Sequence, residues 1–427
     1  MHLGCKKFYI QTFGCQMNVY DGQRIESMLN GLGFSKTDSI ESADVIILNT
    51  CSVREKATNK VFSALGRIRD KKKPDAVFGI VGCVARESGS DAFKRIPDLN
   101  FVLGPQSYHK LPSVLENPDT KHIYTDLSGL EKFDELPKMT SSDLIAYIPI
   151  QEGCSHCCTY CIVPFTRGPE LSRPFDDVMR DVKLAAGQGA IEICFLGQNV
   201  NGYKYNLANL IKETAEISSV KRIRYTSSYP TEMTDELIAL HGTEPKLLPF
   251  LNLPIQSGSS KILKAMNRPY SIEKYMGIID ALRTVRPDIQ ISSDFIVGFP
   301  GETDDDFKET CDTAEKVGYI NSYSFKYSKR PHTFAATMPD QITETVKRER
   351  LKMLEVILNE NVRKFNKECI GKTFDCLLES VDKNGKFIYR TLYMQQVVTD
   401  ANGGNFCKIK ITDGNKCSLR GDIQIEK

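Results

Sequence analysis

The sequence predicts an α/β protein in three parts: an N-terminal parallel α/β domain, a central partial barrel of six strand–helix units, and a small C-terminal β-barrel. Short apolar runs alternate with amphipathic helical stripes through the first two parts, as in parallel α/β folds. Six such units in the middle of the chain are too few for a closed eight-stranded barrel. The last sixty or so residues carry β-rich runs separated by turn residues such as Asn384-Gly385. We place the three domains at residues 1–138, 139–366 and 367–427.

Composition limits the class of protein. The chain has 427 residues, 41% hydrophobic and 26% charged, which is typical of a soluble globular protein. Its net charge of +2 means that any nucleic-acid contact must come from local patches. The N-terminus has no signal-peptide core and no apolar run reaches the roughly 18 residues of a membrane span, so we expect a cytoplasmic protein without membrane contact. Fourteen cysteines in such a chain favour metal ligation or reduced thiols over disulfides.

The first third of the chain places a cysteine after each of three predicted strands. The strands are the apolar runs near residues 8–10, 45–48 and 77–81, and the cysteines are Cys15, Cys51 and Cys83. Helical stripes lie between the strands, so a parallel sheet would bring the three thiols to one edge. Taken singly, each cysteine fits a small buried apolar residue. Their repeated placement favours a [4Fe–4S] cluster with one open iron.

The second set of thiols lies in one polar loop, residues 153–161, with the spacing Cys-x3-Cys-x2-Cys. Cys154, Cys158 and Cys161 would hold three irons of a [4Fe–4S] cluster and leave the fourth open. An open iron can bind S-adenosylmethionine, whose reductive cleavage gives a 5′-deoxyadenosyl radical. Tyr160 would lie beside the adenine of that cofactor. The alternative is a zinc knuckle, for which His156 is the nearest fourth ligand; Cys157 is read as a bystander.

The polar loop segments that directly follow the central strands, called tips here, supply candidate residues for cofactor binding. The strands are expected near residues 145–150, 191–196, 223–226, 251–255, 289–297 and 322–327. Because active sites of such folds lie at the C-terminal strand ends, the tips are candidate cofactor-binding positions. These candidates are Gly197, Gln198, Asn199, Ser257 and Gly298. Taken alone, each tip could equally be a turn or helix cap, and Thr303 with Asp306 predicts a capping box for the next helix.

Several motifs resemble one known family. Residues 13–18, 49–57 and 81–85, Phe-Gly-Cys-Gln-Met-Asn, Asn-Thr-Cys-Ser-Val-Arg-Glu-Lys-Ala and Val-Gly-Cys-Val-Ala, are similar to the N-terminal domain of the methylthiotransferases, radical S-adenosylmethionine enzymes with two clusters. Residues 161–168 and 196–201 strengthen the resemblance, which is greatest to the branch acting on isopentenylated adenosine next to the anticodon, on its 3′ side. A histidine is commoner in the family at the position of Tyr229.

The resemblance implies cofactors and partners. It implies a radical-SAM barrel in the centre, a [4Fe–4S] cluster on each cysteine triad, and S-adenosylmethionine as both methyl donor and radical source. The second cluster, at Cys15, Cys51 and Cys83, would deliver sulfur. The partners would be the anticodon stem-loop of tRNA and an electron donor such as flavodoxin or ferredoxin, while the sulfur donor stays open.

Basic residues in two places are candidate RNA contacts. Arg167, Lys329 and Arg330 lie near the predicted mouth of the central barrel. The tail follows a charged helix, expected over residues 341–367 with Met353, Leu354 and Leu358 facing inward, and resembles the TRAM domain, an RNA-binding barrel. Its candidate RNA-binding residues are Lys408, Lys410 and Arg420. A solvated charged surface is the plain alternative at each position.

The sequence therefore favours an enzyme that replaces an adenine C2–H of tRNA with C2–S–CH3. Two related activities compete with it: methylthiolation of threonylcarbamoyladenosine in tRNA, and methylthiolation of an aspartate of a ribosomal protein. A non-catalytic RNA-binding protein with an iron–sulfur cluster or zinc is the alternative from another class. The order of the methyl-transfer and radical steps is left open.

Overall fold

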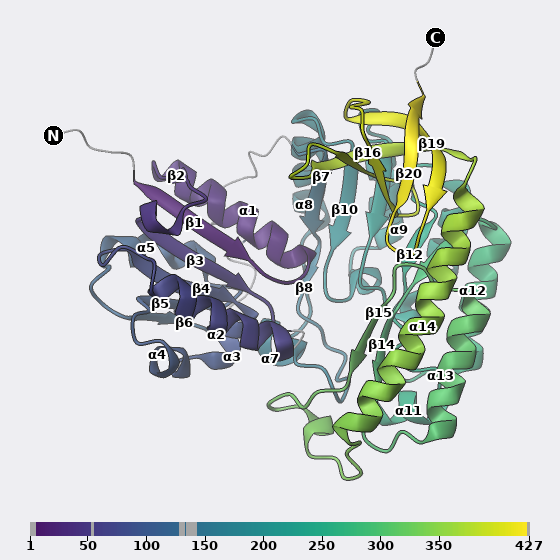
Figure 1. The fold of residues 1–427 in the computed structure, drawn as a ribbon, viewed down its shortest axis with the longest axis horizontal. Coiled ribbons are helices and arrows are strands. Elements are labelled where there is room, and N and C mark those ends of the chain that lie inside the picture. The colour runs from purple at the N-terminus through teal and green to yellow at the C-terminus, as the bar shows by residue number, and fades with distance from the viewer. Residues whose placement is uncertain (1–5, 53–54, 128–132, 134–142, 425–427) are drawn as a thin grey trace.

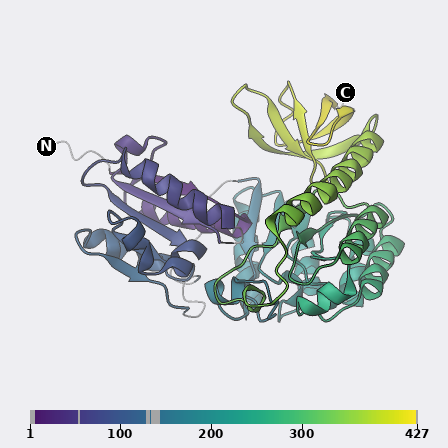
Figure 2. The same cartoon turned by 60° about the horizontal axis from the view of Figure 1, so that its bottom comes forward.

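The computed structural model describes residues 6–52, 55–127, 133 and 143–424. Figure 1 shows an N-terminal sheet with its helices, a central α/β body, and a C-terminal barrel beyond a long helix. The turned view in Figure 2 shows that the N-terminal part and the tail barrel meet different sides of the central body. Among the described residues, no helix combines the length and apolar character that a membrane crossing requires.

The N-terminal part is a parallel sheet with the strand order β2-β1-β3-β4-β5-β6. Its strands are β1 (Lys7–Thr12), β2 (Ser35–Lys36), β3 (Val45–Thr50), β4 (Val77–Gly82), β5 (Phe101–Leu103) and β6 (His122–Tyr124). Its helices are α1 (Gln16–Gly31), α2 (Glu55–Arg69), α3 (Cys83–Ser88), α4 (Asp91–Arg95) and α5 (Leu111–Glu116), with 3₁₀ turns η1 (Ile40–Ser42) and η2 (Tyr108–Lys110). All six residues of β3 are buried, as expected for a strand between paired neighbours with both faces covered. The predicted β-α-β-α-β unit is confirmed as β1, β3 and β4, which are neighbours in the sheet.

The central part is an open, interrupted barrel. Parallel strands pair as β11-β10-β7, β12-β13 and β14-β15, and a short antiparallel pair joins β8 to β9. The strands are β7 (Ile145–Pro149), β8 (Gln151–Glu152), β9 (Leu171–Ser172), β10 (Glu192–Leu196), β11 (Arg222–Tyr225), β12 (Phe250–Asn252), β13 (Gln290–Ser292), β14 (Asp294–Val297) and β15 (Tyr323–Lys326). The helices are α7 (Val163–Arg167), α8 (Phe175–Gly187), α9 (Leu207–Ala215), α10 (Asp235–Thr243), α11 (Ser260–Ala265), α12 (Ile272–Val285) and α13 (Asp304–Val317), with 3₁₀ turns η3 (Val200–Gly202), η4 (Pro230–Glu232) and η5 (Phe334–Ala336). The predicted strand over 289–297 is divided into β13 and β14, and the predicted capping box of Thr303 and Asp306 is confirmed at α13.

The tail is a closed barrel with the order β16-β17-β18-β20-β19. Its strands are β16 (Thr373–Val381), β17 (Phe387–Arg390), β18 (Gln396–Thr399), β19 (Phe406–Gly414) and β20 (Leu419–Gln424). The long helix α14 (Glu344–Cys369) leads into it. Sequence analysis predicted four of these strands and missed β20, because Gly421 and Asp422 weaken its strand pattern.

Two details of the tail correct the sequence analysis. Met353 does not face inward: it is 58% exposed, whereas its neighbour Leu354 is fully buried. Adjacent helical positions point about 100° apart, and the packed stripe of α14 runs through Leu354 and Leu358. The expected domain limit at 366/367 falls inside the last turn of α14, and the limit at 138/139 lies outside the described residues.

The barrel is fixed to the central body by a buried arginine. Arg222 of β11 is 3% exposed. Its guanidinium donates to the carbonyl oxygens of Arg390 at 3.1 Å and Asp375 at 2.5 Å, both in the barrel. The same guanidinium lies 5.1 Å from the ring centre of Phe406. Three contacts from one buried cation therefore hold the tail in a defined place.

Candidate functional site

The cluster loop, residues 153–161, is held at both ends by backbone contacts. It leaves β8 at Gly153, where φ is +76° and an added Cβ would lie 2.0 Å from the carbonyl oxygen of Pro169. Cys154 N donates to Gly168 O at 3.2 Å, which ties the start of the loop to the end of α7. Glycine is therefore required at position 153, both for its positive φ and because the backbone of residues 168–169 approaches it closely.

The far side of the loop rests on the segment after α11. Thr159 N donates to Met266 O at 3.0 Å, and Thr159 Oγ1 donates to Ala265 O at 2.9 Å. Asn267, in the left-handed region with φ of 57°, donates from its side chain to Cys157 O at 2.9 Å. The segment of residues 265–267 thus holds the loop by hydrogen bonds, although it is about 100 residues away in sequence.

The three thiols of the loop act on one another electrostatically. Burial, with the neighbouring Cys158 thiol, raises the pKa of Cys154 to about 11 and that of Cys161 to about 12. Such thiols would stay protonated in the protein alone. A bound cation would reverse this by stabilising the thiolates, since a coordinated thiol is deprotonated. The loop thiols are thus close enough to act on one another, and iron ions bound to them would favour their thiolate forms.

Arg268 is the charged residue beside this triad. It is 4% exposed, and its guanidinium lies 3.9 Å from Cys158 Sγ. It also donates to Tyr160 Oη at 3.3 Å, and its Nη2 donates to Pro254 O at 2.7 Å. The sequence does not single out Arg268, because its partners Cys158 and Tyr160 are 110 and 108 residues away.

The tip after β10 is bound to the loop through glutamine side chains. Gln151 Oε1 accepts from the backbone N–H groups of Gln198 at 3.1 Å and Asn199 at 3.0 Å. Gln198 in turn accepts from Gly153 N at 2.6 Å through Oε1. Gly197 has no room for a side chain, since an added Cβ would lie 2.5 Å from Gln151 Oε1. Three of the sequence candidates, Gly197, Gln198 and Asn199, therefore lie next to the cluster loop.

A polar group also surrounds His156 of the loop. His156 Nε2 and Glu232 Oε1 share a hydrogen bond of 2.9 Å, and the His156 ring stacks on Tyr229 with 3.8 Å between ring centres. Asn199 Nδ2 donates to Glu170 Oε2 at 3.0 Å. Among the described residues, three buried oxygens of this group have no hydrogen-bond partner: Asn199 Oδ1, Glu232 Oε2 and Tyr229 Oη. Orphaned buried polar atoms indicate a place for a polar ligand.

The other two sequence candidates lie in tightly packed positions. Ser257 is fully buried and its Oγ accepts from Ser259 N at 3.2 Å, so its observed role is to shape the loop. Gly298 has φ of +71°, and an added Cβ would lie 2.3 Å from Cγ of Lys347 in α14. Both positions are explained by packing in the structure, and a cofactor contact by either stays a prediction.

The N-terminal triad of Cys15, Cys51 and Cys83 is assembled by the sheet. Cys15 caps α1 after β1, Cys51 follows β3, and Cys83 opens α3 after β4. A hydrogen bond with Cys51, helped by the nearby Arg167 guanidinium, lowers the pKa of Cys15 to about 6. Burial raises the pKa of Cys83, and the positive charge of Arg167 opposes that rise. The predicted meeting of the three strand ends is confirmed.

The turns next to these cysteines leave no room for larger residues. At Gly14, with φ of +123°, an added Cβ would lie 2.2 Å from Cys51 Cβ. At Gly82, with φ of +94°, it would lie 2.4 Å from Thr50 O. The glycines of the Phe-Gly-Cys and Val-Gly-Cys motifs thus let the cysteine-bearing turns come together.

Two arginines expected to face RNA are instead buried between the N-terminal and central parts. Arg167 is 2% exposed and pairs with Asp21 of α1 at 3.0 Å and Glu152 of β8 at 2.5 Å. Arg330 is also buried, and its guanidinium donates to the carbonyl oxygen of Ser52, next to Cys51. The guanidiniums of Arg167 and Arg330 are bonded to groups inside the protein and do not face RNA, whereas Lys329 is exposed.

The structure bears on the zinc alternative at the cluster loop. Among the described residues, no three His, Cys, Asp or Glu side chains come close enough to hold one metal ion. The irons and sulfides of a cubane lie between its thiolates, which are therefore farther apart than those around zinc. In the zinc alternative His156 would be the fourth ligand, but its Nε2 is bonded to Glu232.

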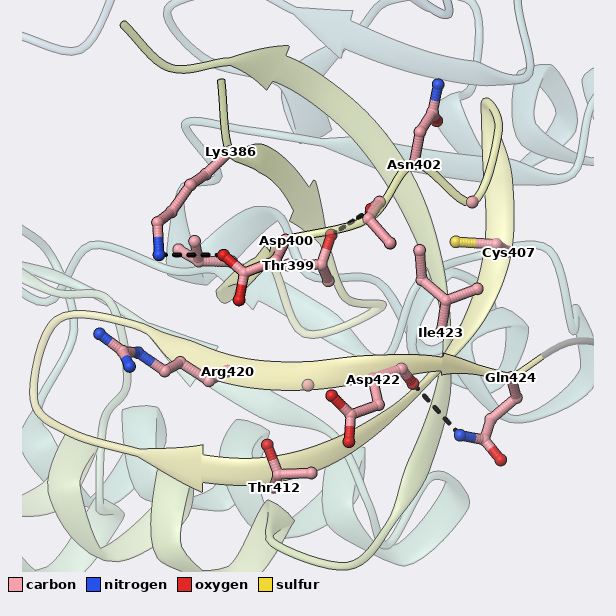
Figure 3. A pocket seen from close by; sticks show the side chains of 14 residues that line it. Lys386, Thr399, Asp400, Asn402, Cys407, Thr412, Arg420, Asp422, Ile423 and Gln424 are labelled. Carbon is pink, nitrogen blue, oxygen red and sulfur yellow. Dashed lines mark hydrogen bonds and ion pairs between the residues drawn. The ribbon is translucent and has the colours of Figure 1, made fainter. Parts of the chain in front are cut away.

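The tail presents the predicted basic residues on its surface. Lys408 and Lys410 of β19 and Arg420 of β20 are exposed. Arg420 lines a cavity of about 660 Å³ on the barrel, well away from both cysteine triads. In Figure 3, Lys386 and Arg420 lie at one end of this cavity, and Lys386 pairs with Asp400 at 3.0 Å. Asp400 and Asp422 also line this cavity, so the exposed cations of the tail, rather than the cavity, are its candidate contacts with a polyanion.

Comparison with known proteins adds family evidence. Residues 7–104 match the model of uncharacterized protein family UPF0004, and residues 148–314 match the Radical SAM superfamily. Proteins described as tRNA-2-methylthio-N(6)-dimethylallyladenosine synthase from Rickettsia canadensis and Rickettsia akari are each 47% identical, over 98% of this chain and 99% of theirs.

Solved structures share the fold at low sequence identity. The radical S-adenosylmethionine methyltransferase TsrM from Kitasatospora setae, with tryptophan and a SAM analogue bound, is 11% identical with a TM-score of 0.59, over 88% of this chain and 79% of that one. The cobalamin-dependent S-adenosylmethionine radical enzyme OxsB is 13% identical with a TM-score of 0.54, over 83% of this chain and 56% of that one.

Proposed function

Since the chain belongs to the tRNA-2-methylthio-N(6)-dimethylallyladenosine synthase family of radical S-adenosylmethionine enzymes, we propose that it converts isopentenyladenosine of tRNA to its 2-methylthio derivative. The target base is the adenosine on the 3′ side of the anticodon. We also propose the domain limits near residues 138 and 366, an anticodon stem-loop as the bound part of tRNA, and a location in the cytoplasm with its substrate.

The cofactors of this family are two [4Fe–4S] clusters and S-adenosylmethionine, which when bound supply radical formation at one cluster and a sulfur-holding iron at the other. In our proposal Cys154, Cys158 and Cys161 hold the first cluster. Cys15, Cys51 and Cys83 hold the second. Each set provides three thiolates and so leaves one iron free for a ligand.

The protein's own residues position these parts. Gln151 and Gln198 fix the glycine turn that opens the cluster loop. Tyr160 and Asn199 line the same region, and the buried oxygen Asn199 Oδ1 is free to accept a hydrogen bond from the cofactor. An electron donor such as flavodoxin or ferredoxin is required as the source of the reducing electron.

One observation carries the proposal: the sheet places Cys15, Cys51 and Cys83 at an edge that faces the central part of the same chain. Arg167, six residues after Cys161, pairs with Asp21 of α1 at 3.0 Å, and its helix α7 packs against α3, which Cys83 opens. This packing supports the proposal, because C–S bond formation on a single substrate base needs the proposed sulfur-holding site and the proposed radical-generating site in one assembly.

The product nucleoside tests the proposal. Reconstituted protein, reductant, S-adenosylmethionine and tRNA bearing isopentenyladenosine should yield the 2-methylthio nucleoside by mass spectrometry of digested tRNA. tRNA bearing threonylcarbamoyladenosine is the control and should stay unmodified. Modification of the control tRNA alone, or of neither tRNA while 5′-deoxyadenosine is absent, would contradict the proposal.

A further inference from the structure

Arg167 occupies an unusual place between the two cysteine triads. It ends α7, the short helix that begins two residues after Cys161, and its guanidinium lies between Glu152 of β8, directly before the cluster loop, and Asp21 of α1 in the N-terminal part. Its backbone oxygen accepts from Gln106 Nε2 at 2.9 Å. The adjacent Gly168 O accepts from Cys154 N at 3.2 Å. One short segment therefore bonds to the cluster loop through its backbone and to α1 of the N-terminal part through its side chain.

The surroundings of the guanidinium are almost wholly anionic. Asp21, fully buried, lies 3.0 Å away and Glu152, also buried, lies 2.5 Å away. Helix α7, which Arg167 ends, packs against α3, whose first residue is Cys83, and Arg86 of α3 donates to Phe165 O of α7 at 3.4 Å. Asp21 lies in α1, whose N-cap is Cys15. In keeping with this placement, the charges of Arg167 and Asp21 act on both thiols in opposite directions. The N-terminal triad thus lies beside a buried group of one cation, Arg167, and its two paired carboxylates, Asp21 and Glu152.

The burial makes these charges effective. Interactions between charges grow as the local dielectric falls, and all three side chains are removed from water. A cluster held by three thiolates is anionic, and a one-electron reduction adds a further negative charge. A cation that the protein fixes beside the cluster favours the reduced form, and a fixed anion disfavours it.

We propose that Arg167 is a positioning residue of the N-terminal cluster, whose fixed positive charge raises the reduction potential of that cluster while its backbone joins the cluster to the radical loop. Asp21 holds the guanidinium in place and lowers the same potential by its own charge. The inference rests on the proposed function, because it requires a cluster on Cys15, Cys51 and Cys83.

The test is a redox titration of the reconstituted full-length protein followed by EPR. The Cys154→Ala variant identifies which signal belongs to the N-terminal cluster. Arg167→Gln should shift the potential of that cluster to more negative values, and Asp21→Asn should shift it to less negative values. Arg167→Lys, which keeps the charge, should lie nearer to the unsubstituted protein. A purely structural role would give lower thermal stability in all variants without shifts of opposite sign.

The control is a buried arginine of the central part. Arg224 is also buried and pairs with Glu192 at 2.6 Å, so Arg224→Gln removes a buried ion pair away from the triad and should leave the potential unchanged. If the Arg167→Gln protein cannot be loaded with iron, the change in the reduction potential of the N-terminal cluster in Asp21→Asn tests the inference instead. Unshifted potentials, or shifts of the same sign, overturn the inference while leaving the proposed function intact. Absence of an N-terminal cluster signal in the Cys154→Ala variant, with its iron content near zero, would instead refute the second cluster itself.

Discussion

At the scale of single residues, Arg268 contacts the loop triad from a buried position. Its guanidinium lies beside Cys158 Sγ and donates to Tyr160 Oη and to the carbonyl oxygen of Pro254. Its guanidinium also lies 4.6 Å from the ring centre of Tyr229, which stacks on His156. One cation therefore holds together the rings and the thiol around the proposed cofactor site.

We predict that Arg268→Leu abolishes formation of 5′-deoxyadenosine while the N-terminal cluster is retained. The change leaves Pro254 O without its donor, which should lower the free energy of unfolding by ~1–3 kcal/mol. Iron analysis should fall from about eight to about four per chain, as two cubanes become one. Arg283→Leu removes a comparable bond to Val317 O, away from both triads, and should keep the iron and the activity. Full cofactor cleavage by Arg268→Leu would contradict the assignment.

Residue types and spacing in the sequence predict which cysteines are candidate ligands, but not that Arg167 and Arg330 are buried. The spacing of Cys154, Cys158 and Cys161 is local and can be read from nine residues. Arg167 and Arg330 look like free surface cations in the sequence, because their partners Asp21 and Ser52 are 146 and 278 residues away. Long-range pairs of this kind leave no periodic pattern in the sequence.

At the scale of elements, the cluster loop depends on a single glycine turn. Gly153→Ala would place a Cβ against Pro169 O in a conformation with positive φ, so we predict loss of the loop cluster and of cofactor cleavage. Gly277 is the matched control, since an added Cβ there meets nothing within 4 Å. Because it lies inside α12, Gly277→Ala should stabilise the protein by up to about 1 kcal/mol. Absorption spectra after reconstitution and thermal unfolding distinguish the two; an intact cluster spectrum in Gly153→Ala would refute the prediction.

Element prediction worked best where apolar runs were long. β1, β3 and β4 each have six residues and were predicted, whereas β2, β5 and β6 have two or three and were missed. Short strands depend on pairing with neighbours more than on their own residues. The order of the long strands still sufficed to predict that three cysteines meet at one edge.

At the scale of the whole molecule, the tail barrel is held in place by Arg222 and carries exposed cations. Truncation would expose Arg222 and its partners, so charge replacement gives a cleaner test of RNA binding. The combined change of Lys408, Lys410 and Arg420 to Gln should weaken tRNA binding and reduce the salt dependence of log K by about 0.7 per lost phosphate contact.

The control replaces Lys274, Lys352 and Lys364, exposed residues of α12 and α14, by Gln. Filter binding over a range of salt measures both slopes; equal affinity and slope in the two triple variants would exclude the barrel as the RNA anchor.

The central claim is that the molecule separates radical formation from sulfur delivery, one on each triad. The most direct measurement compares 5′-deoxyadenosine and methylthio nucleoside formed by folded Cys158→Ala and Cys51→Ala proteins. Cys158→Ala should form neither product, because the radical step is lost. Cys51→Ala should still form 5′-deoxyadenosine but no methylthio nucleoside, since only the site on Cys15, Cys51 and Cys83 is damaged. A folded Cys51→Ala protein that makes the methylthio nucleoside would contradict the claim.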